Sequence, residues 1–329
     1  SILFDVLDTT RMKQEITIAS ISDKVYGAAP FSFSASTSSG LELTFMTEGP
    51  IAIEDELITI SGVGTASIVA RQAGDEEYNA ASLKMTFEID KAPLTATAES
   101  KSRIYGEVNP ALTISYAGFV NGETVADITE PSAEVIADEL SEVGSYPITL
   151  SGGSANNYTI TLANGSMSVE KATLTVTPDD QQKVYGEENP GFTFEYSGFV
   201  NEEDASVITT APAFSSDATA SSDVGSYEIA GSGGEATNYS FSYETGALTV
   251  VKADQVISIE AIDDKDVTAE PFAVVASATS GLELSYEVTG PATVEGNIIT
   301  LTGVTGEVEV SVSQLGNINY HAAATETVS

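Results

Sequence analysis

The stretch KVYGEENPGFTFEYSGFVN, residues 183–201, shows that the chain is modular, because it recurs as RIYGEVNPALTISYAGFVN at residues 103–121. The two copies align Tyr185 with Tyr105, a spacing of 80 residues. The match continues downstream, where VGSYPITLSGGSANNYTIT (143–161) corresponds to VGSYEIAGSGGEATNYSFS (224–242). Such a period indicates tandem modules, each of which folds as one repeated unit.

A second kind of repeat flanks these two. FSFSASTSSGLELTFMTEGP (31–50) corresponds to FAVVASATSGLELSYEVTGP (272–291), and both units end in Tyr-x-Ala-Ala, at Tyr78 and at Tyr320. The order is therefore outer, inner, inner, outer. We predict four domains, named here module 1 (13–91), module 2 (92–171), module 3 (172–252) and module 4 (253–329), with residues 1–12 belonging to a preceding region.

The modules show the period-2 alternation of half-buried strands. LTATAES (94–100), YTITLAN (158–164) and EVEVSVS (307–313) alternate apolar and polar side chains between turn residues, which is typical of antiparallel sheets with one solvated face. We therefore predict an all-β chain of four small antiparallel β-sandwiches, either immunoglobulin-like or β-grasp-like. The exception is Asn201, which is followed by three acids and predicts a short capped helix, as Asn121 does more weakly.

The junctions are short and lack flexible spacers. Lys91, Lys171 and Lys252 stand where one alternating run passes directly into the next, without the Gly/Ser or Pro-rich composition of a linker. We expect the modules to lie end to end with limited swing. Four domains of this size would then extend well over about 100 Å, as a monomeric rod within a larger chain.

Charge excludes several classes of partner. The 329 residues carry 49 acidic and 12 basic side chains, a formal net charge of −37, which repels nucleic-acid phosphates and anionic lipid surfaces. No apolar run reaches the roughly 18 residues of a membrane span. We therefore expect neither nucleic-acid binding nor membrane insertion by this segment.

The sequence offers little material for catalysis. His321 is the single histidine and cysteine is absent, so His321 would have to serve any Ser-His-Asp triad, and a zinc site would lack ligands. Its place in the Tyr-x-Ala-Ala ending is taken by Asn79 in module 1, which indicates an exposed loop. The glycine-rich loops 151–157 and 231–238 lack the Lys-Ser/Thr of a phosphate-binding loop and read as hairpin turns.

No insertion in one module builds a cleft for a pair of glycosidase carboxylates. We therefore predict a protein that is not an enzyme, with no catalytic, cofactor-binding or metal-ligating residues assigned.

Two binding alternatives stay open. Carboxylate oxygens suit calcium, and acids cluster at residues 54–56, 75–77, 179–180, 202–204 and 263–266, although none has the order of a dedicated calcium loop. Aromatic residues are the second alternative. The recurring tyrosines predict core positions whose hydroxyls reach the backbone rather than a binding platform; they are Tyr105, Tyr146, Tyr158, Tyr185, Tyr227 and Tyr239.

The inner modules resemble the MBG domain of the YGX type, through Tyr-Gly at 105–106 and 185–186, the following Asn-Pro, GFVN, VGSY and the closing Asn-Tyr. The outer modules resemble bacterial Ig-like repeats, through Lys24, Tyr26, Gly27, Pro30, Phe31, the Ser-Gly-Leu at 39–41 and the ending at 78–81. Together the resemblances cover nearly all of the chain after residue 13. Module 4 departs from the pattern, with KDVT at 265–268 in place of KVYG, which indicates that the Tyr-Gly turn is dispensable.

The resemblance implies a non-enzymatic stalk or adhesin segment of a bacterial cell-surface or secreted protein. Such a segment spaces or presents an adhesive region, and the export signal and the anchor lie in other parts of the parent. The alternative is a set of carbohydrate- or protein-binding modules, with the inner pair as the receptor. A surface glycan or protein of the host or the environment would then be the partner.

Overall fold

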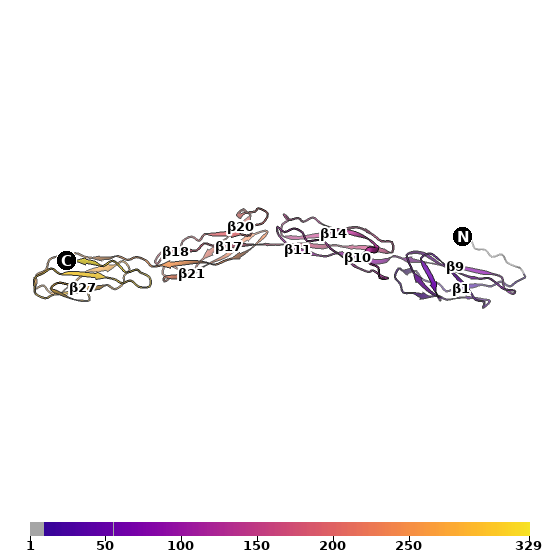
Figure 1. Ribbon diagram of the computed structural model, residues 1–329, viewed down its shortest axis with the longest axis horizontal. Helices are drawn as coiled ribbons and strands as arrows, with labels where there is room; N and C mark the ends of the chain where they lie inside the picture. Colours follow the sequence, from indigo (N-terminus) through magenta and orange to yellow (C-terminus); the bar gives the residue numbers. More distant parts are fainter. Residues whose placement is uncertain (1–9, 55) are drawn as a thin grey trace. The chain divides into compact units, whose positions relative to one another are not determined.

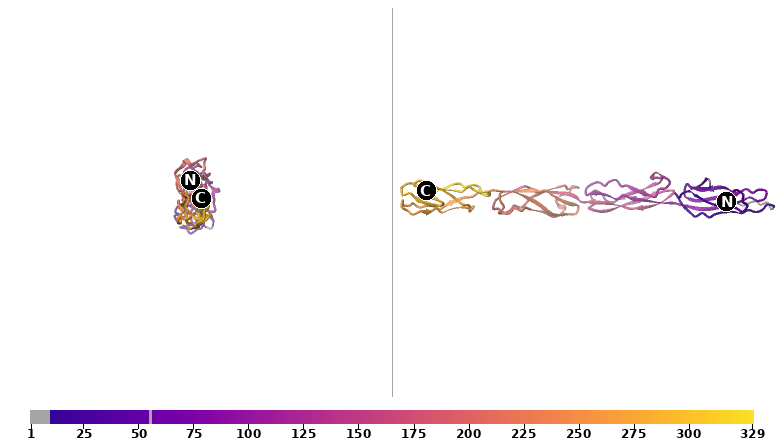
Figure 2. Two further views of the ribbon diagram at one scale, coloured as in Figure 1. Left: turned by 90° about the vertical axis from the view of Figure 1, so that its left-hand side faces the viewer. Right: turned by 90° about the horizontal axis from the view of Figure 1, so that it is seen from below.

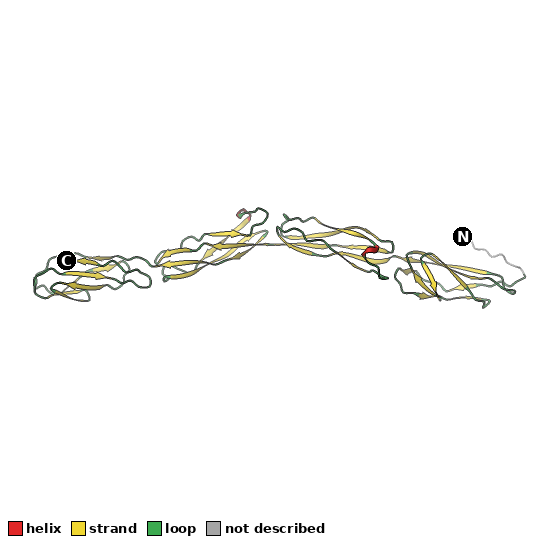
Figure 3. Cartoon of the chain, viewed as in Figure 1, coloured by secondary structure: helices red, strands yellow, loops and turns green. Residues whose placement is uncertain are grey.

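The computed structural model describes residues 10–54 and 56–329, and most of the segment predicted to precede module 1 lies outside them. The chain divides between Glu170 and Lys171 into two compact units. The described residues are built almost wholly of strands and loops (Figure 3). The prediction of an all-β fold is confirmed.

Module 1 packs two sheets and a short strand pair. The sheets have the orders β2-β9-β8-β5 and β3-β7-β6, and β1 pairs with β4. Ile58, Ile68 and Phe87 lie at the centre of its core. The strands are β1 (Ile16–Ile18), β2 (Lys24–Val25), β3 (Phe31–Ser32), β4 (Ala35–Thr37), β5 (Thr44–Glu48), β6 (Ile51–Glu54), β7 (Leu57–Ile60), β8 (Gly64–Gln72) and β9 (Ala81–Asp90).

Module 2, labelled by β10, β11 and β14 in Figure 1, packs a three-stranded sheet β12-β10-β15 on a four-stranded sheet β11-β16-β14-β13. Its strands are β10 (Ala92–Ala98), β11 (Lys101–Ile104), β12 (Ile114–Ala117), β13 (Thr129–Val135), β14 (Gly144–Ser154), β15 (Tyr158–Ala163) and β16 (Gly165–Glu170).

Module 3 repeats this arrangement, with sheets β19-β17-β22 and β18-β23-β21-β20. Its strands are β17 (Ala172–Pro178), β18 (Gln181–Val184), β19 (Phe194–Ser197), β20 (Ile208–Ser215), β21 (Gly225–Ala236), β22 (Tyr239–Tyr243) and β23 (Gly246–Val251).

Module 4 forms one group of strands, yellow in Figure 2, with the pair β24-β26 and the sheets β25-β29-β28 and β27-β30-β31. Its strands are β24 (Ile257–Ile259), β25 (Phe272–Ala273), β26 (Ala276–Ala278), β27 (Ser285–Thr289), β28 (Ala292–Glu295), β29 (Ile298–Leu301), β30 (Glu309–Ser313) and β31 (Glu326–Val328).

The alternation in the sequence is the alternation of burial. In β10, Ala92, Leu94 and Ala96 are buried, while Pro93 is exposed and Thr95 and Thr97 are only partly covered. Since successive side chains of a strand point to opposite faces, the apolar residues at alternate positions all enter the core between the two sheets.

The prediction of purely antiparallel sheets is wrong. In module 2, β10 runs parallel to β15 and β11 runs parallel to β16, and module 3 repeats both pairings with β17 and β22 and with β18 and β23. In each of these four pairs the second strand starts more than 60 residues after the first, so a long crossover connects them. Alternation of apolar and polar residues does not reveal such a crossover.

The predicted helices in modules 2 and 3 are also wrong. In their place stand single three-residue 3-10 turns, η1 (Val125–Asp127) and η2 (Ala205–Val207). Asn121 and Asn201 do not cap them, because both adopt a positive φ of 56° and 55° and so end the preceding turn instead. The caps are Thr124 and Asp204, and the β-branched residues that follow continue directly into β13 and β20.

Candidate functional site

The opening motif of module 3 fastens a loop. The Lys183 ammonium is buried and donates to the carbonyl oxygens of Thr219 at 2.6 Å and of Glu187 at 3.1 Å. The Asn189 amide donates to the carbonyl of Ala218 at 2.7 Å. The Lys183 ammonium and the Asn189 amide N–H are therefore both engaged with the backbone of residues 187 and 218–219.

We call these hydrogen bonds of Lys183 and Asn189 the clamp of module 3. Module 2 has the same clamp, with arginine in place of lysine. The Arg103 Nε donates to Asn109 Oδ1 at 2.8 Å, a second guanidinium nitrogen donates to the Asp138 carbonyl, and the Asn109 amide donates to the Ala137 carbonyl at 2.6 Å. The guanidinium of arginine presents its N–H donors in a planar fork, whereas the ammonium of lysine does not. In module 3 the counterpart of the accepting oxygen, Asn189 Oδ1, is buried without a hydrogen-bond partner.

The Tyr-Gly pair of module 1 contacts module 2. The Tyr26 ring meets the Tyr158 ring edge-on, with centroids 5.9 Å apart and planes at 86°, and the Tyr26 hydroxyl donates to Glu123 Oε1 at 2.9 Å. Gly27 has a φ of +86°, and a Cβ there would lie 2.5 Å from Val120 Cγ2. Glycine is thus needed both for the turn and for the close approach of Val120.

The interpretation of Tyr-Gly as a dispensable turn is therefore corrected: in module 1 it is a junction contact.

Glu123 is the acid at the centre of this junction. Its second oxygen, Oε2, accepts from the hydroxyl of Tyr158, which is 3% exposed and also accepts from the Val120 N–H at 3.1 Å. Burial, and then the hydrogen bond to the Glu123 carboxylate, raise the pKa of Tyr158 to about 12. At neutral pH the hydroxyl keeps its proton and so remains a donor to the carboxylate.

Module 3 has the same tyrosine and acid. The Tyr239 hydroxyl bonds to Glu203 Oε2 and accepts from the Val200 N–H at 3.1 Å. Asp204 accepts from the Ser206 N–H, and its hydrogen bonds to Ser206 lower its pKa. Glu203 therefore faces a tyrosine hydroxyl, and Asp204 faces the backbone of the 3-10 turn.

Modules 3 and 4 are joined by a comparable contact. The rings of Tyr185 and Tyr320 pack edge to face, with centroids 5.4 Å apart. The amide of Asn319, 7% exposed, donates to Asp223 Oδ1 at 2.7 Å, and the Val224 N–H donates to Asn319 Oδ1 at 3.0 Å. The tyrosine of the KVYG motif thus contacts the neighbouring module at two junctions: Tyr26 between modules 1 and 2, and Tyr185 between modules 3 and 4.

The junction lysines recur in role as well. Lys91, Lys171 and Lys252 each donate to a backbone carbonyl two residues before the Asn-Tyr pair of the following module: Ala155 at 2.8 Å, Ala236 at 2.8 Å and Asn317 at 2.6 Å. Two further recurring tyrosines form hydrogen bonds within their own modules. The hydroxyls of Tyr146 and Tyr227 donate to the carbonyls of Glu142 and Asp223, both at 2.8 Å, as predicted, and Tyr105 is buried.

The acid clusters do not assemble a metal site in the part of the chain that the structure describes, where no three His, Cys, Asp or Glu side chains are placed to hold an ion. Asp75 accepts from the backbone N–H groups of Glu77 and Tyr78, and Asp180 accepts from that of Ala247. Asp55 of the first cluster lies outside the described residues. Asp75 and Asp180 are thus bonded to the protein's own backbone, and the calcium hypothesis gains no support.

His321 is exposed, as predicted, and its backbone groups pair with Ala253 and with the Gln255 amide. Within residues 10–54 and 56–329, no helix is long and apolar enough to cross a membrane.

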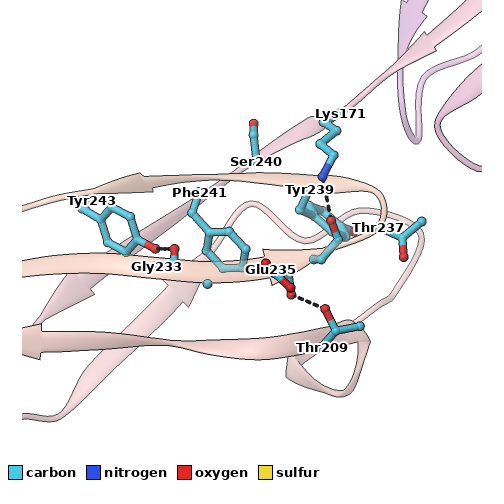
Figure 4. Close-up of a pocket in the computed structure, with 11 residues that line it drawn as sticks. Lys171, Thr209, Gly233, Glu235, Thr237, Tyr239, Ser240, Phe241 and Tyr243 are labelled. Carbon is cyan, nitrogen blue, oxygen red and sulfur yellow. Dashed lines mark hydrogen bonds between the residues drawn. The ribbon is translucent and has the colours of Figure 1, made fainter.

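A cleft of about 540 Å³ opens in module 3 between the edge strand β22 and the hairpin of β20 and β21. Phe241 and Tyr243 project from β22 into it, with ring centroids 6.3 Å apart and planes at 12° (Figure 4). The Tyr243 hydroxyl donates to the Gly233 carbonyl, and Glu235 lies at the rim beside Thr209, whose hydroxyl donates to the Glu235 carbonyl at 2.8 Å.

The aromatic pair depends on a glycine. A Cβ at Gly231 would lie 2.5 Å from Tyr243 Cδ1 and 2.6 Å from Phe214 Cε1, so the rings occupy the space of the absent side chain. The sequence interpretation of residues 231–238 as a hairpin loop missed this cleft. The available signal was the change from YTITL in module 2 to YSFSY in module 3, two new aromatics on one face of a strand.

A second hollow, of about 370 Å³, lies in module 4 among Phe272, Leu301, Val308, Val310 and Val328. In module 1 the corresponding space is core: Phe87 pairs across the sheet with Ala66 and packs edge-on against Phe31 at 6.1 Å. The apolar lining of this hollow is therefore explained as part of the module's own core, without a ligand.

Comparison with known proteins identifies the inner modules. Residues 94–168 and 174–249 each match the family model of the MBG domain (YGX type). Among curated protein sequences, none matches the chain.

Solved structures with similarity to the chain include Drosophila N-cadherin EC1-4 (11% identity, 87% of this chain and 91% of that one, TM-score 0.28). The N-terminal eight Ig domains of Down Syndrome Cell Adhesion Molecule match over 93% of this chain and 53% of that one (11% identity, TM-score 0.21). A SusE-like surface polysaccharide-binding protein of Bacteroides thetaiotaomicron matches at 12% identity over 95% and 72% (TM-score 0.17). At these TM-scores the likenesses carry no functional argument; the sequence match alone identifies modules 2 and 3 as MBG domains of the YGX type.

Proposed function

We propose that this chain is a non-enzymatic spacer of a bacterial cell-surface or secreted protein, in which MBG domains flanked by bacterial Ig-like repeats hold an adhesive region at a distance. The observation that carries the proposal is the junction of modules 1 and 2, where the hydroxyls of Tyr26 and Tyr158 share the carboxylate of Glu123. This contact resists bending, because bending would separate the Tyr26 hydroxyl from Glu123 and expose the buried Tyr26 ring to water.

Two further features support a structural role. The polar side chains that recur between modules 2 and 3 are engaged with backbone or with each other, as the clamps at Arg103 and Lys183 illustrate. The net charge of −37 keeps such a chain soluble and discourages self-association. Placement outside the cell and a glycan or protein partner for the presented region follow from the proposal and are part of it.

Small-angle X-ray scattering of the whole chain tests the proposal. A compact particle of 329 residues would have a radius of gyration of about 20 Å, whereas four modules in a row give at least about 30 Å. We expect the larger value, in low and in physiological salt alike. A radius near that of the compact particle would contradict a spacer.

A further inference from the structure

The cleft of module 3 is made by a local set of differences from module 2. Against a common backbone, Phe241 and Tyr243 stand where module 2 has Ile160 and Leu162, and Gly231 and Phe214 stand where it has Leu150 and Ala133. All four changes meet at one place, since Tyr243 packs on Phe214 at 6.1 Å and both rings cover Gly231. The two modules have the same register in their parallel strand pairs, although they differ at these four positions.

The recurring residues in the cleft have structural duties. Lys171 donates to the Ala236 carbonyl, as Lys91 does to Ala155, and Tyr239 bonds to Glu203, as Tyr158 does to Glu123. What distinguishes the cleft is therefore the aromatic pair on its floor and Glu235 on its rim, where module 2 has Ser154.

This lining combines two aromatic rings with exposed polar side chains. Phe241 and Tyr243 are partly buried and nearly parallel, while the side chains of Glu235, Thr209 and Thr237 are exposed around them. In Figure 4 both rings point from β22 toward β21, whereas Ser240 points away from the cleft. The volume of about 540 Å³ is that of a small-molecule site, and the cleft is broadly open to solvent.

A pyranose ring fits these features. Its C–H face packs on aromatic rings, as apolar groups do, and its hydroxyls donate to carboxylate and carbonyl oxygens. An anionic ligand is disfavoured by Glu235 and by the surplus of 37 negative charges. A lipid tail would need an enclosed apolar lining, which an open cleft with threonine and glutamate at its rim does not offer.

We propose that this cleft is a binding site for neutral carbohydrate, in which a sugar ring packs on Phe241 and Tyr243 and its hydroxyls are bonded by Glu235. Module 2, with Ile160 and Leu162 at the same positions, lacks the site. The site is independent of the spacer role: scattering tests the arrangement of modules, and sugar binding tests one module.

Titration of the whole chain with neutral oligosaccharides, followed by NMR, tests the proposal. The probes are hexaoses of glucose, mannose, galactose and xylose, with heparin as the anionic comparison. At least one neutral hexaose is expected to bind with a Kd between about 0.1 and 5 mM and to shift the signals of Gly233, Phe241 and Tyr243, while those of Ile160 and Leu162 stay unchanged.

Three variants define the site. Glu235→Ser introduces the module 2 residue at an exposed position, so folding is unaffected, and we expect binding to weaken at least fivefold. The pair Phe241→Ile and Tyr243→Leu, again the residues of module 2, should abolish binding. Tyr227→Phe is the matched control, because it removes a hydroxyl of module 3 that bonds to Asp223 and lies outside the cleft.

The proposal is overturned by any of three results. No neutral hexaose shifts the cleft signals at 10 mM; or Glu235→Ser and the double variant bind as tightly as the parent chain; or heparin binds there in preference to the neutral sugars. Should the double variant lose its fold, Glu235→Ser and the mapping on the parent chain decide the matter.

Discussion

Modules 2 and 3 share a backbone and differ in a patch. The parallel pair that begins each module has one register, Ala92 with Tyr158 and Ala172 with Tyr239, and both modules keep the tyrosine that bonds to a glutamate. They differ in the cation of the clamp and in the residues around Gly231. Positions with the same residue in both modules therefore hold the fold and its junctions. Positions that differ together mark the cleft, which is a feature of module 3 alone.

The largest effect is expected when module 3 receives the residue that module 2 has at the position corresponding to 231, a leucine. Gly231→Leu forces a side chain into the space of Tyr243 and Phe214, and overpacking of this kind costs about 3 kcal/mol. Hydrogen exchange of the amides of β21 and β23 should report the loss, while the amides of β14 in module 2 serve as the internal reference.

Adding Phe214→Ala, Phe241→Ile and Tyr243→Leu to Gly231→Leu completes the module 2 set and should restore most of the protection. If the single substitution leaves the exchange of β21 unchanged, the glycine is not what admits the aromatic pair.

The shared tyrosine predicts a loss of stability at high pH. An unfolded tyrosine titrates near pH 10, whereas the folded-state pKa of Tyr158 is raised to about 12 by burial and by Glu123. The resulting stabilisation is complete below pH 10. It is lost as the pH rises from 10 to 12, because the unfolded chain releases its proton first, and the total is roughly 2–3 kcal/mol.

Hydrogen exchange of β10 and β16, corrected for the intrinsic exchange rate at each pH, compares the parent with Tyr158→Phe. The parent should lose more stability than the variant across this window. Parallel pH profiles for the two chains would show that Tyr158 is not the group responsible.

Exchanging the cations of the two clamps should have the smallest effect on stability, with opposite signs in modules 2 and 3. Lys183→Arg supplies module 3 with the guanidinium that module 2 has, which can donate to the unpartnered Asn189 Oδ1, and it should stabilise module 3 by about 1 kcal/mol. The reciprocal Arg103→Lys should destabilise module 2 by about 1–2 kcal/mol, since it strips Asn109 Oδ1 of its donor. Urea denaturation followed by NMR, module by module, measures both changes, and equal effects of the two substitutions in sign would contradict the clamp.

The sequence predicted what is local. Period-2 alternation located strands such as β10 and β30, because burial alternates with each residue of a strand. It did not reveal the parallel pairing of β10 with β15, which depends on a crossover, nor the 3-10 turns, which depend on the positive φ of Asn121 and Asn201.

The site residues divide in the same way. Recurrence marked the tyrosines, but the partner of Tyr26 is 97 residues away at Glu123, so the junction could not be read from either motif alone. The aromatic pair was visible as Phe241 and Tyr243, yet its meaning rests on Gly231 from another strand, and no spacing rule joins those positions.

The central claim, that recurring tyrosines hold neighbouring modules in a fixed relation, is tested most directly at the junction of modules 1 and 2. The chain has no cysteine, so spin labels on cysteines introduced at the exposed Ser36 and Thr149 are the only ones present, and electron paramagnetic resonance gives the distribution of their separation. We predict one narrow distribution in the parent chain and in the control Tyr146→Phe, and a clearly broader one in Tyr26→Ala. A broad distribution in the parent that Tyr26→Ala leaves unchanged would contradict the account.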